Sequence, residues 1–320
     1  MRNILSRYLD INKDYVYVKN IYENGAPQNQ SALDTKDREY GANKVYDDLV
    51  NALISEFNGE DGNPKKNVYF FSYDFRKSNS ESAEKLNRYI EDVLKANPDY
   101  TQVDLVCHSM GGLVASKYVS AQGADKIHRI VTAGTPYEGA PKLFISSMTR
   151  DVTEKWYVDP LLVFAGLNRK TKTSFPGAAQ LLPTKEYFES ASTLFKYAKV
   201  KIRAKLADPR KPILLPEDVE YEEVFEYETM DLPYYNTLNG KIFRSNDVEA
   251  AARFHQEIKD VASGYNVLLG MENSYFITGG GQKTVTGVSF KIYEQFNKER
   301  IEIVPEYSDE GGRRTARGGV

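Results

Sequence analysis

Between residues 41 and 132 the spacing of apolar residues predicts helices and strands in alternation. Apolar residues recur every four positions from Val45 to Phe57, which is the spacing of one helix face. The sequence NVYFFSY at 67–73 predicts a strand. A second helix is expected to run to about Ala96, with Ser78 and Glu81 at the spacing of a capping box. Further strand and helix patterns follow up to KIHRIVT, residues 126–132. This alternation predicts an α/β protein with a mostly parallel sheet flanked by helices.

The stretch VDLVCHSMGGLVASKY, residues 103–118, lies at the centre of this pattern. Val103–Cys107 has the composition of a buried strand and Leu113–Val119 that of a helix, so residues 108–111 are expected to form the turn between them. A serine in such a turn is typical of a nucleophile elbow, where it adopts a strained conformation with positive φ. The sequence therefore predicts Ser109 as a catalytic nucleophile.

Crowding in such a turn requires small residues on both sides of the serine. Cys107 and Gly111, two positions before and after Ser109, are both small, although Gly is usual where Cys107 stands. We expect no room there for larger side chains. The simpler alternative, in which Ser109 only caps the helix, stays open.

Composition excludes several classes of function. With 42 Lys+Arg against 45 Asp+Glu the net charge is -3, which does not indicate nucleic-acid binding. One cysteine cannot form an internal disulfide. Three histidines without Cys or carboxylate clusters at ligand spacing argue against a zinc site. We therefore expect no metal and no cofactor.

The N-terminal sequence lacks an apolar core of signal-peptide length, and no apolar run approaches the ~20 residues of a membrane span. The expectation is a chain without signal peptide or transmembrane segment, and the compartment stays open, with the cytoplasm as the default. The sequence leaves the oligomeric state open.

Several separated motifs occur together in a recognisable order: FSYDFR (71–76), LVCHSMGG (105–112), AGTPYEGAPK (133–142), PGAAQLLPTKEYF (176–188) and ENSYFITGGGQKT (272–284). Over about residues 40–310 the chain resembles the lecithin:cholesterol acyltransferase-like lipases. FSYDFR corresponds to that family's YDWR stretch, with Phe75 in place of Trp. The resemblance implies an α/β-hydrolase fold that acts on ester bonds of lipids.

The domain prediction follows from where the alternation stops. We expect an N-terminal extension at 1–40, a hydrolase core at 41–143 and 265–310, a lid or cap insertion at 144–264 and a flexible tail at 311–320. The aromatic-rich insertion would suit peripheral contact with a lipid surface. Its aromatic residues could equally form the core of a small helical subdomain. The tail, rich in Gly and Arg, would also fit a truncated or frame-shifted end.

The oxyanion donors and the catalytic acid and base are less clear in the sequence than the nucleophile. The backbone N–H of Met110 is the expected oxyanion donor, but no loop before Gly41 matches the one that usually supplies a second donor. The resemblance implies an acid in a GDGTVP-like turn and a histidine after it. The chain instead reads VPEYSDEGG (304–312), and Asp309 lies outside the matching position.

None of the three histidines is a convincing base. His108 adjoins the nucleophile, His128 is expected in a strand and His255 in a helix before the late strand, so each is interpreted as structural. Three functions remain. One is a serine-dependent lipid ester hydrolase or O-acyltransferase that forms an acyl-Ser109 intermediate. The others are a non-catalytic pseudoenzyme or fragment, and a serine hydrolase of another class such as a thioesterase or amide hydrolase. We expect this chain to be a poor catalyst or inactive, with negligible turnover of short-chain esters.

Overall fold

The computed structural model describes residues 22–23, 26–27, 42–57, 68–141, 175–184, 186–187, 195–200, 222–223, 245–280, 284–295 and 298–307. The predicted tail at 311–320 and Asp309 lie outside these residues.

A parallel sheet carries the stretch around Ser109. It contains β3 (Val103–His108), β4 (Ile127–Ala133) and β7 (Ser274–Ile277) in the order β3-β4-β7, and both neighbouring pairs are parallel. Because strand directions agree, the carboxyl ends of all these strands meet at one edge. The predicted parallel sheet is therefore present.

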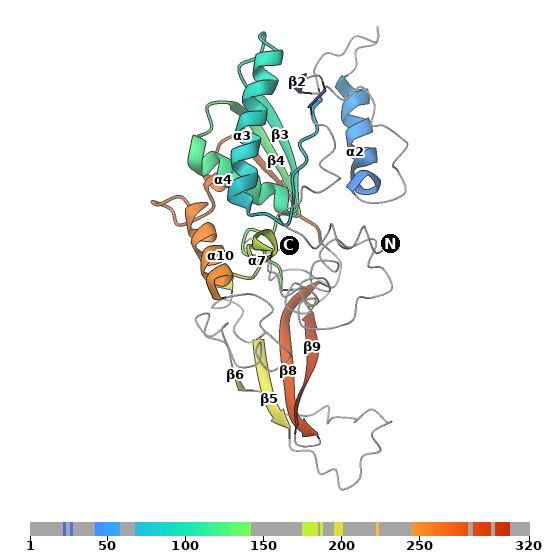
Figure 1. Cartoon of the computed structure of the whole chain (residues 1–320), viewed down its shortest axis with the longest axis vertical. Coiled ribbons are helices and arrows are strands. Elements are labelled where there is room, and N and C mark those ends of the chain that lie inside the picture. Colours follow the sequence, from blue (N-terminus) through green and yellow to red (C-terminus); the bar gives the residue numbers. More distant parts are fainter. Residues whose placement is uncertain are drawn as a thin grey trace.

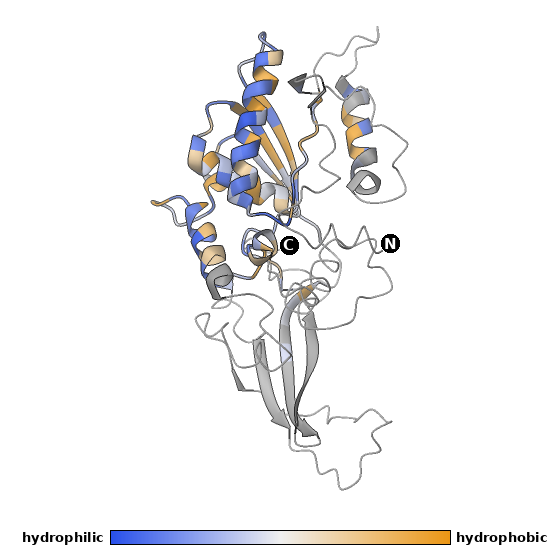
Figure 2. Ribbon diagram, in the orientation of Figure 1, coloured by the Kyte–Doolittle hydropathy of each residue, from blue (hydrophilic) through white to orange (hydrophobic). Residues whose placement is uncertain are grey.

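Two helices cover one face of this sheet (Figure 1). Helix α3 (Asn79–Ala96) and helix α4 (Met110–Gln122) pack together, and the short 3-10 helix η4 (Val267–Gly270) joins them in the same core. The buried core cluster comprises Ala83, Leu86, Ile90, Val114, Ala115, Tyr118, Ile127, Ile130 and Leu268. Figure 2 shows hydrophilic residues along the outward side of α3, as expected for an amphipathic helix.

Helix α3 begins as the sequence predicts, with one difference. The Ser78 hydroxyl accepts a hydrogen bond from the Glu81 N–H at 3.1 Å, which is the expected N-cap. The Glu81 carboxylate, however, pairs with Lys77 at 3.2 Å and with Lys85 at 3.5 Å. The described contacts of Glu81 thus show one half of the predicted capping box and ion pairs in place of the other.

The predicted helix over 41–57 is α2 (Ala42–Phe57), whereas the predicted strand over 67–73 is not a regular strand. Residues 68–73 run without regular secondary structure apart from a single bridge at Tyr69. Their aromatic side chains still pack on the core: Phe71 stacks on Tyr73 with ring centroids 5.9 Å apart. The prediction of a strand here was wrong: partly buried aromatic side chains pack on the core without a hydrogen-bonded ladder.

A second sheet has the order β6-β5-β8-β9 and extends away from the helices (Figure 1). Its strands are β5 (Phe195–Val200), β6 (Glu222–Glu223), β8 (Val285–Gln295) and β9 (Lys298–Tyr307). Strand β5 comes from the expected insertion and pairs in parallel with β8 from the expected core. The sequence did not predict this sheet.

Two strands and two helices complete the described elements. Strands β1 (Tyr22–Glu23) and β2 (Ala26–Pro27) form an antiparallel pair, and α7 (Pro176–Ala179) and α10 (Ser245–Glu257) contact one another. In the described part of the chain, every helix is too short or too polar to cross a membrane.

Candidate active site

Ser109 lies in the sharp turn between β3 and α4, at the carboxyl edge of the parallel sheet. Its φ of 51° and ψ of -124° are unusual for a residue with a Cβ atom, and no other non-glycine among the described residues has positive φ. The Ser109 N–H donates to the Ala133 carbonyl at 2.8 Å, and the Ser109 carbonyl accepts from the Gly112 N–H at 3.1 Å. The backbone conformation is the one predicted from the sequence.

The crowded position beside this turn is not the one that the sequence suggested. A Cβ atom added to Gly111 would lie 3.8 Å from the Cys107 Cβ, an ordinary van der Waals contact. A Cβ atom added to Gly112 would instead overlap the side chain of Thr135. The prediction that Gly111 leaves no room was therefore wrong: the crowded residue is Gly112, which Thr135, two residues after β4, contacts.

Cys107, the residue two positions before Ser109, is not a second nucleophile. Burial raises the pKa of the Cys107 thiol to about 12. The thiolate, which is the reactive form, is therefore absent at neutral pH. Cys107 packs against the buried core cluster and acts as a small apolar residue.

Met110 is the first residue of α4, and its side chain is buried with 8% exposure. The first N–H groups of a helix have no carbonyl one turn earlier to bind. They also lie at the positive end of the helix dipole, which favours negative charge. The Met110 N–H, next to Ser109, is therefore suited to donate a hydrogen bond to an anion.

Two of the three histidines have hydrogen bonds away from Ser109. His108 is the last residue of β3 and not part of the turn, and its Nδ1 lies 2.8 Å from the Tyr46 hydroxyl of α2. His128 is exposed, and its Nδ1 lies 2.8 Å from an Asp104 oxygen near the amino end of β3. Asp104 stands five residues before Ser109 on that strand, which at ~3.3 Å per residue is roughly 16 Å away.

His255, on α10, is buried and neutral. Its Nε2 donates to the Gln180 carbonyl at 2.9 Å, and burial lowers the pKa of the ring to about 4. Because a carbonyl only accepts, Nε2 carries the proton and cannot take one from a serine. The described hydrogen bonds of all three histidines thus lie elsewhere than on the Ser109 hydroxyl.

Gln180 and the residues after it connect several sequence motifs through hydrogen bonds. Its Oε1 accepts from the Asn79 N–H at 2.7 Å, at the start of α3, while its carbonyl accepts from His255. The next residue, Leu181, accepts from the Ala140 N–H at 2.8 Å, and the Thr184 N–H donates to the Glu138 carbonyl at 3.0 Å. The AGTPYEGAPK and PGAAQLLPT motifs are therefore direct neighbours in the fold.

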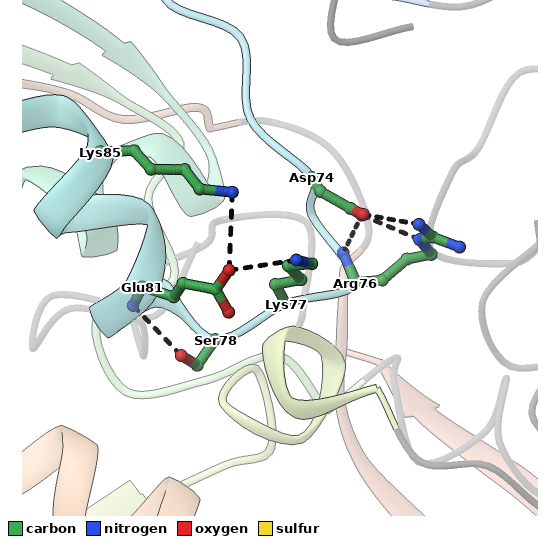
Figure 3. A network of polar contacts seen from close by, with 6 residues as sticks. All are labelled: Asp74, Arg76, Lys77, Ser78, Glu81 and Lys85. Atoms are coloured by element: carbon green, nitrogen blue, oxygen red, sulfur yellow. Dashed lines mark hydrogen bonds and ion pairs between the residues drawn. The ribbon is translucent and has the colours of Figure 1, made fainter. Parts of the chain in front are cut away.

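The FSYDFR motif packs on the same segment. The Asp74 carboxylate accepts from the Arg76 Nη2 at 2.6 Å, the Arg76 Nε at 2.9 Å and the Arg76 N–H at 3.1 Å (Figure 3). Arg76 is fully buried and Asp74 is 4% exposed. The Gly177 N–H donates to the Arg76 carbonyl at 3.3 Å, and a Cβ atom on Gly177 would overlap the Phe75 carbonyl. This buried pair fixes the loop on which α7 rests.

Sequence reasoning missed the structural roles of Thr135, Gln180 and Tyr46. Each contacts a residue far along the chain, so local spacing carried no signal for them. The separated motifs did contain Thr135 and Gln180. Within the residues that the structure describes, no cluster of three or more His, Cys, Asp or Glu side chains could hold a metal ion.

Comparison with known proteins identifies the family. Residues 28–285, more than half of the chain, match the family model described as lecithin:cholesterol acyltransferase. A protein of Saccharomyces cerevisiae described as "Uncharacterized protein YJR098C" is 37% identical over 94 residues, which is 29% of this chain and 13% of the yeast protein.

A solved chain from "The crystal structure of Tle4-Tli4 complex" is 20% identical with a TM-score of 0.47. That match covers 77% of this chain and 55% of the solved chain. This chain therefore spans only part of the length of both proteins. On the family match, it belongs to the lecithin:cholesterol acyltransferase family, which implies an α/β-hydrolase fold and agrees with the parallel sheet and its helices.

Proposed function

We propose that the protein is a serine-dependent lipid ester hydrolase or O-acyltransferase that works through an acyl-Ser109 intermediate. Membership of the family suggests lipid acyltransferase or esterase activity, and a lipid or other ester substrate fits it. The observation that carries the assignment to Ser109 is its positive φ between β3 and α4. Strained backbone of this kind persists where the surroundings impose it, and it clusters at active sites.

The chemistry would proceed in two acyl transfers. The Ser109 Oγ attacks the ester carbonyl carbon and its proton passes to water, and the tetrahedral oxyanion is stabilised by the Met110 N–H. Collapse of this intermediate breaks the bond to the alcohol oxygen, which takes a proton from water as it leaves. Water or a second alcohol then attacks the acyl-Ser109, releasing an acid or a new ester and restoring the serine hydroxyl. Nothing in these steps needs a cofactor.

A general base is the part that the histidines do not supply. One ring nitrogen of His108 is hydrogen-bonded to Tyr46, and one of His255 to the Gln180 carbonyl. His128 lies near the amino end of the sheet. An unactivated serine is a weak nucleophile, and loss of a triad member leaves only about 10³ to 10⁴-fold acceleration over water. We therefore propose that this chain reacts at Ser109 slowly.

The insertion proposed at 144–264 would then face a lipid surface. Two described parts of it contact the core: Gln180 accepts from the Asn79 N–H, and Glu257 at the end of α10 accepts from Lys117. We propose peripheral lipid contact there.

Site-directed labelling tests the proposal. The protein is incubated with a fluorophosphonate probe, digested and analysed by peptide mass spectrometry, with Ser109→Ala as the matched control. We expect slow labelling of the peptide that contains Ser109 and none in Ser109→Ala. Absence of any label after prolonged incubation would favour the pseudoenzyme, and a label that persists in Ser109→Ala would place the nucleophile elsewhere.

Substrate class is tested by comparing esters of increasing acyl length with a thioester and an amide of the same acyl group. A preference for long-chain oxygen esters supports lipid ester chemistry. A preference for the thioester or the amide would assign the protein to another class of serine hydrolase.

A further inference from the structure

The strained backbone at Ser109 needs support from more than one side. A residue in such a conformation costs about 1 to 3 kcal/mol, so it persists only when neighbouring contacts fix it. On one side the Ala133 carbonyl binds the Ser109 N–H at 2.8 Å, and Thr135 packs against Gly112. Both contacts come from β4 and the residues that follow it.

The other support comes from α2. The Tyr46 hydroxyl lies 2.8 Å from the His108 Nδ1, and the two rings meet edge to face with centroids 5.5 Å apart. Tyr46 also contacts Phe70, with ring centroids 6.2 Å apart. His108 therefore joins α2 to the strand end that directly precedes Ser109.

Protonation limits this hydrogen bond to two forms. Burial lowers the pKa of His108 and raises the pKa of Tyr46, so at neutral pH the ring is neutral and the phenol is protonated. Either the Tyr46 hydroxyl donates to Nδ1 and the ring proton lies on Nε2, or an Nδ1–H donates to the phenol oxygen, and each pairing fixes one tautomer. A defined tautomer is thus a direct signature of the contact.

The register of the sheet connects this contact to the serine. His108 is paired with Ala133 in the last position of the β3-β4 ladder, and the next N–H along β3, that of Ser109, donates to the Ala133 carbonyl. Fraying of the strand at His108 would lengthen that hydrogen bond first. Anchoring the His108 ring on α2 opposes such fraying.

We propose that Tyr46 is a positioning residue, which holds the end of β3 through His108 and so keeps the Ser109 backbone in its strained turn. The consequence for reactivity rests on the proposed function of Ser109, whereas the consequence for the backbone does not. The two can therefore be measured separately.

The variant is Tyr46→Phe, which keeps the ring and removes the hydroxyl. Its matched control is Tyr265→Phe, because Tyr265 is 63% exposed on the loop after α10. Amide hydrogen exchange is followed by NMR at Ser109 and Gly112, with the Ile127 N–H, which donates to the Ala124 carbonyl at 2.8 Å, as an internal reference. Imidazole ¹⁵N shifts report the His108 tautomer, which is easily assigned among three histidines.

In Tyr46→Phe we expect exchange at Ser109 and Gly112 to become about tenfold faster while Ile127 is unchanged, because only the strand end is released. The His108 ring should change from a single defined tautomer to a mixture of tautomers. Fluorophosphonate labelling of Ser109 should slow about tenfold. Tyr265→Phe should alter none of these.

Unchanged exchange at Ser109 in Tyr46→Phe would overturn the positioning role, whatever the labelling shows. An unchanged His108 tautomer would overturn it as well. A wild-type protein that is never labelled would overturn the proposed function of Ser109 alone, and the exchange result would still decide the role of Tyr46.

Discussion

The Thr135 side chain occupies the space where a Cβ atom of residue 112 would lie. Gly112→Ala should therefore destabilise the protein by about 1 to 3 kcal/mol, the usual cost of overpacking a buried position. It should also slow the labelling of Ser109, because the Gly112 N–H binds the Ser109 carbonyl. Urea unfolding followed by circular dichroism measures the first effect.

Gly111→Ala is the matched control. Its new Cβ would meet the Cys107 Cβ at 3.8 Å without overlap, and alanine favours helix over glycine. We expect stability within about 1 kcal/mol of wild type. Equal losses in Gly111→Ala and Gly112→Ala would contradict the assignment of the crowded position.

Cys107 provides a second test of crowding beneath Ser109. Cys107→Leu should cost about 1 to 3 kcal/mol or more and displace Ser109, because a branched side chain must enter the core cluster on which Cys107 packs. Cys107→Ala should stay within about 1 kcal/mol of wild type. The melting temperatures of Cys107→Leu and Cys107→Ala are compared. Identical values would show that the site around residue 107 has room for a leucine side chain.

His255 makes stability depend on pH. Its pKa is depressed by burial from 6.5 to about 4, so the unfolded state takes up a proton before the folded state does. The stabilisation is therefore complete above pH 6.5 and is lost as pH falls toward about 4. At pH 5 this residue alone should reduce the free energy of unfolding by about 2 kcal/mol relative to pH 7.5.

His255→Gln isolates that contribution, since glutamine does not titrate and can still donate to the Gln180 carbonyl. Urea unfolding of both proteins at pH 7.5 and pH 5 gives a double difference in which other groups cancel. The wild type should lose about 2 kcal/mol more than the variant. Parallel losses in the two proteins would rule out a buried neutral His255.

Two neighbouring ion-pair systems should differ sharply in their contribution to stability (Figure 3). Asp74→Ala leaves the fully buried Arg76 guanidinium without its carboxylate and should cost about 3 kcal/mol. Glu81→Gln removes only partly exposed pairs with Lys77 and Lys85 and should cost less than about 1 kcal/mol. Chemical denaturation measures the free energy of unfolding of both variants. A larger decrease in Glu81→Gln than in Asp74→Ala would contradict this prediction.

Local sequence patterns predicted the parts of the fold that depend on local physics. The strand at β3, the helix at α4 and the Ser78 cap each follow from residues within a few positions of one another. The positive φ of Ser109 was predictable for the same reason, because a strand and a helix leave only a tight turn between them.

Contacts between distant segments could not be predicted in this way. Thr135 presses on Gly112 only because β3 and β4 are neighbours in register, and Gln180 binds the start of α3 across 101 residues of chain. The sheet that pairs β5 with β8 depends on a similar long-range match. The apolar pattern also wrongly predicted a strand at residues 68–73, because side chains can pack on a core without a hydrogen-bonded ladder.

Direct detection of the acyl-enzyme tests the central claim, that Ser109 carries the acyl group. The protein is incubated with a long-chain nitrophenyl ester, quenched in acid and digested, and the mass of the peptide containing Ser109 is compared among wild type, Ser109→Ala and His255→Gln. We expect the acyl mass on this peptide in wild type and in His255→Gln, none in Ser109→Ala, and slow nitrophenol release that does not depend on His255. An acyl group on another residue, no acyl group at all, or rapid turnover abolished in His255→Gln would contradict the account.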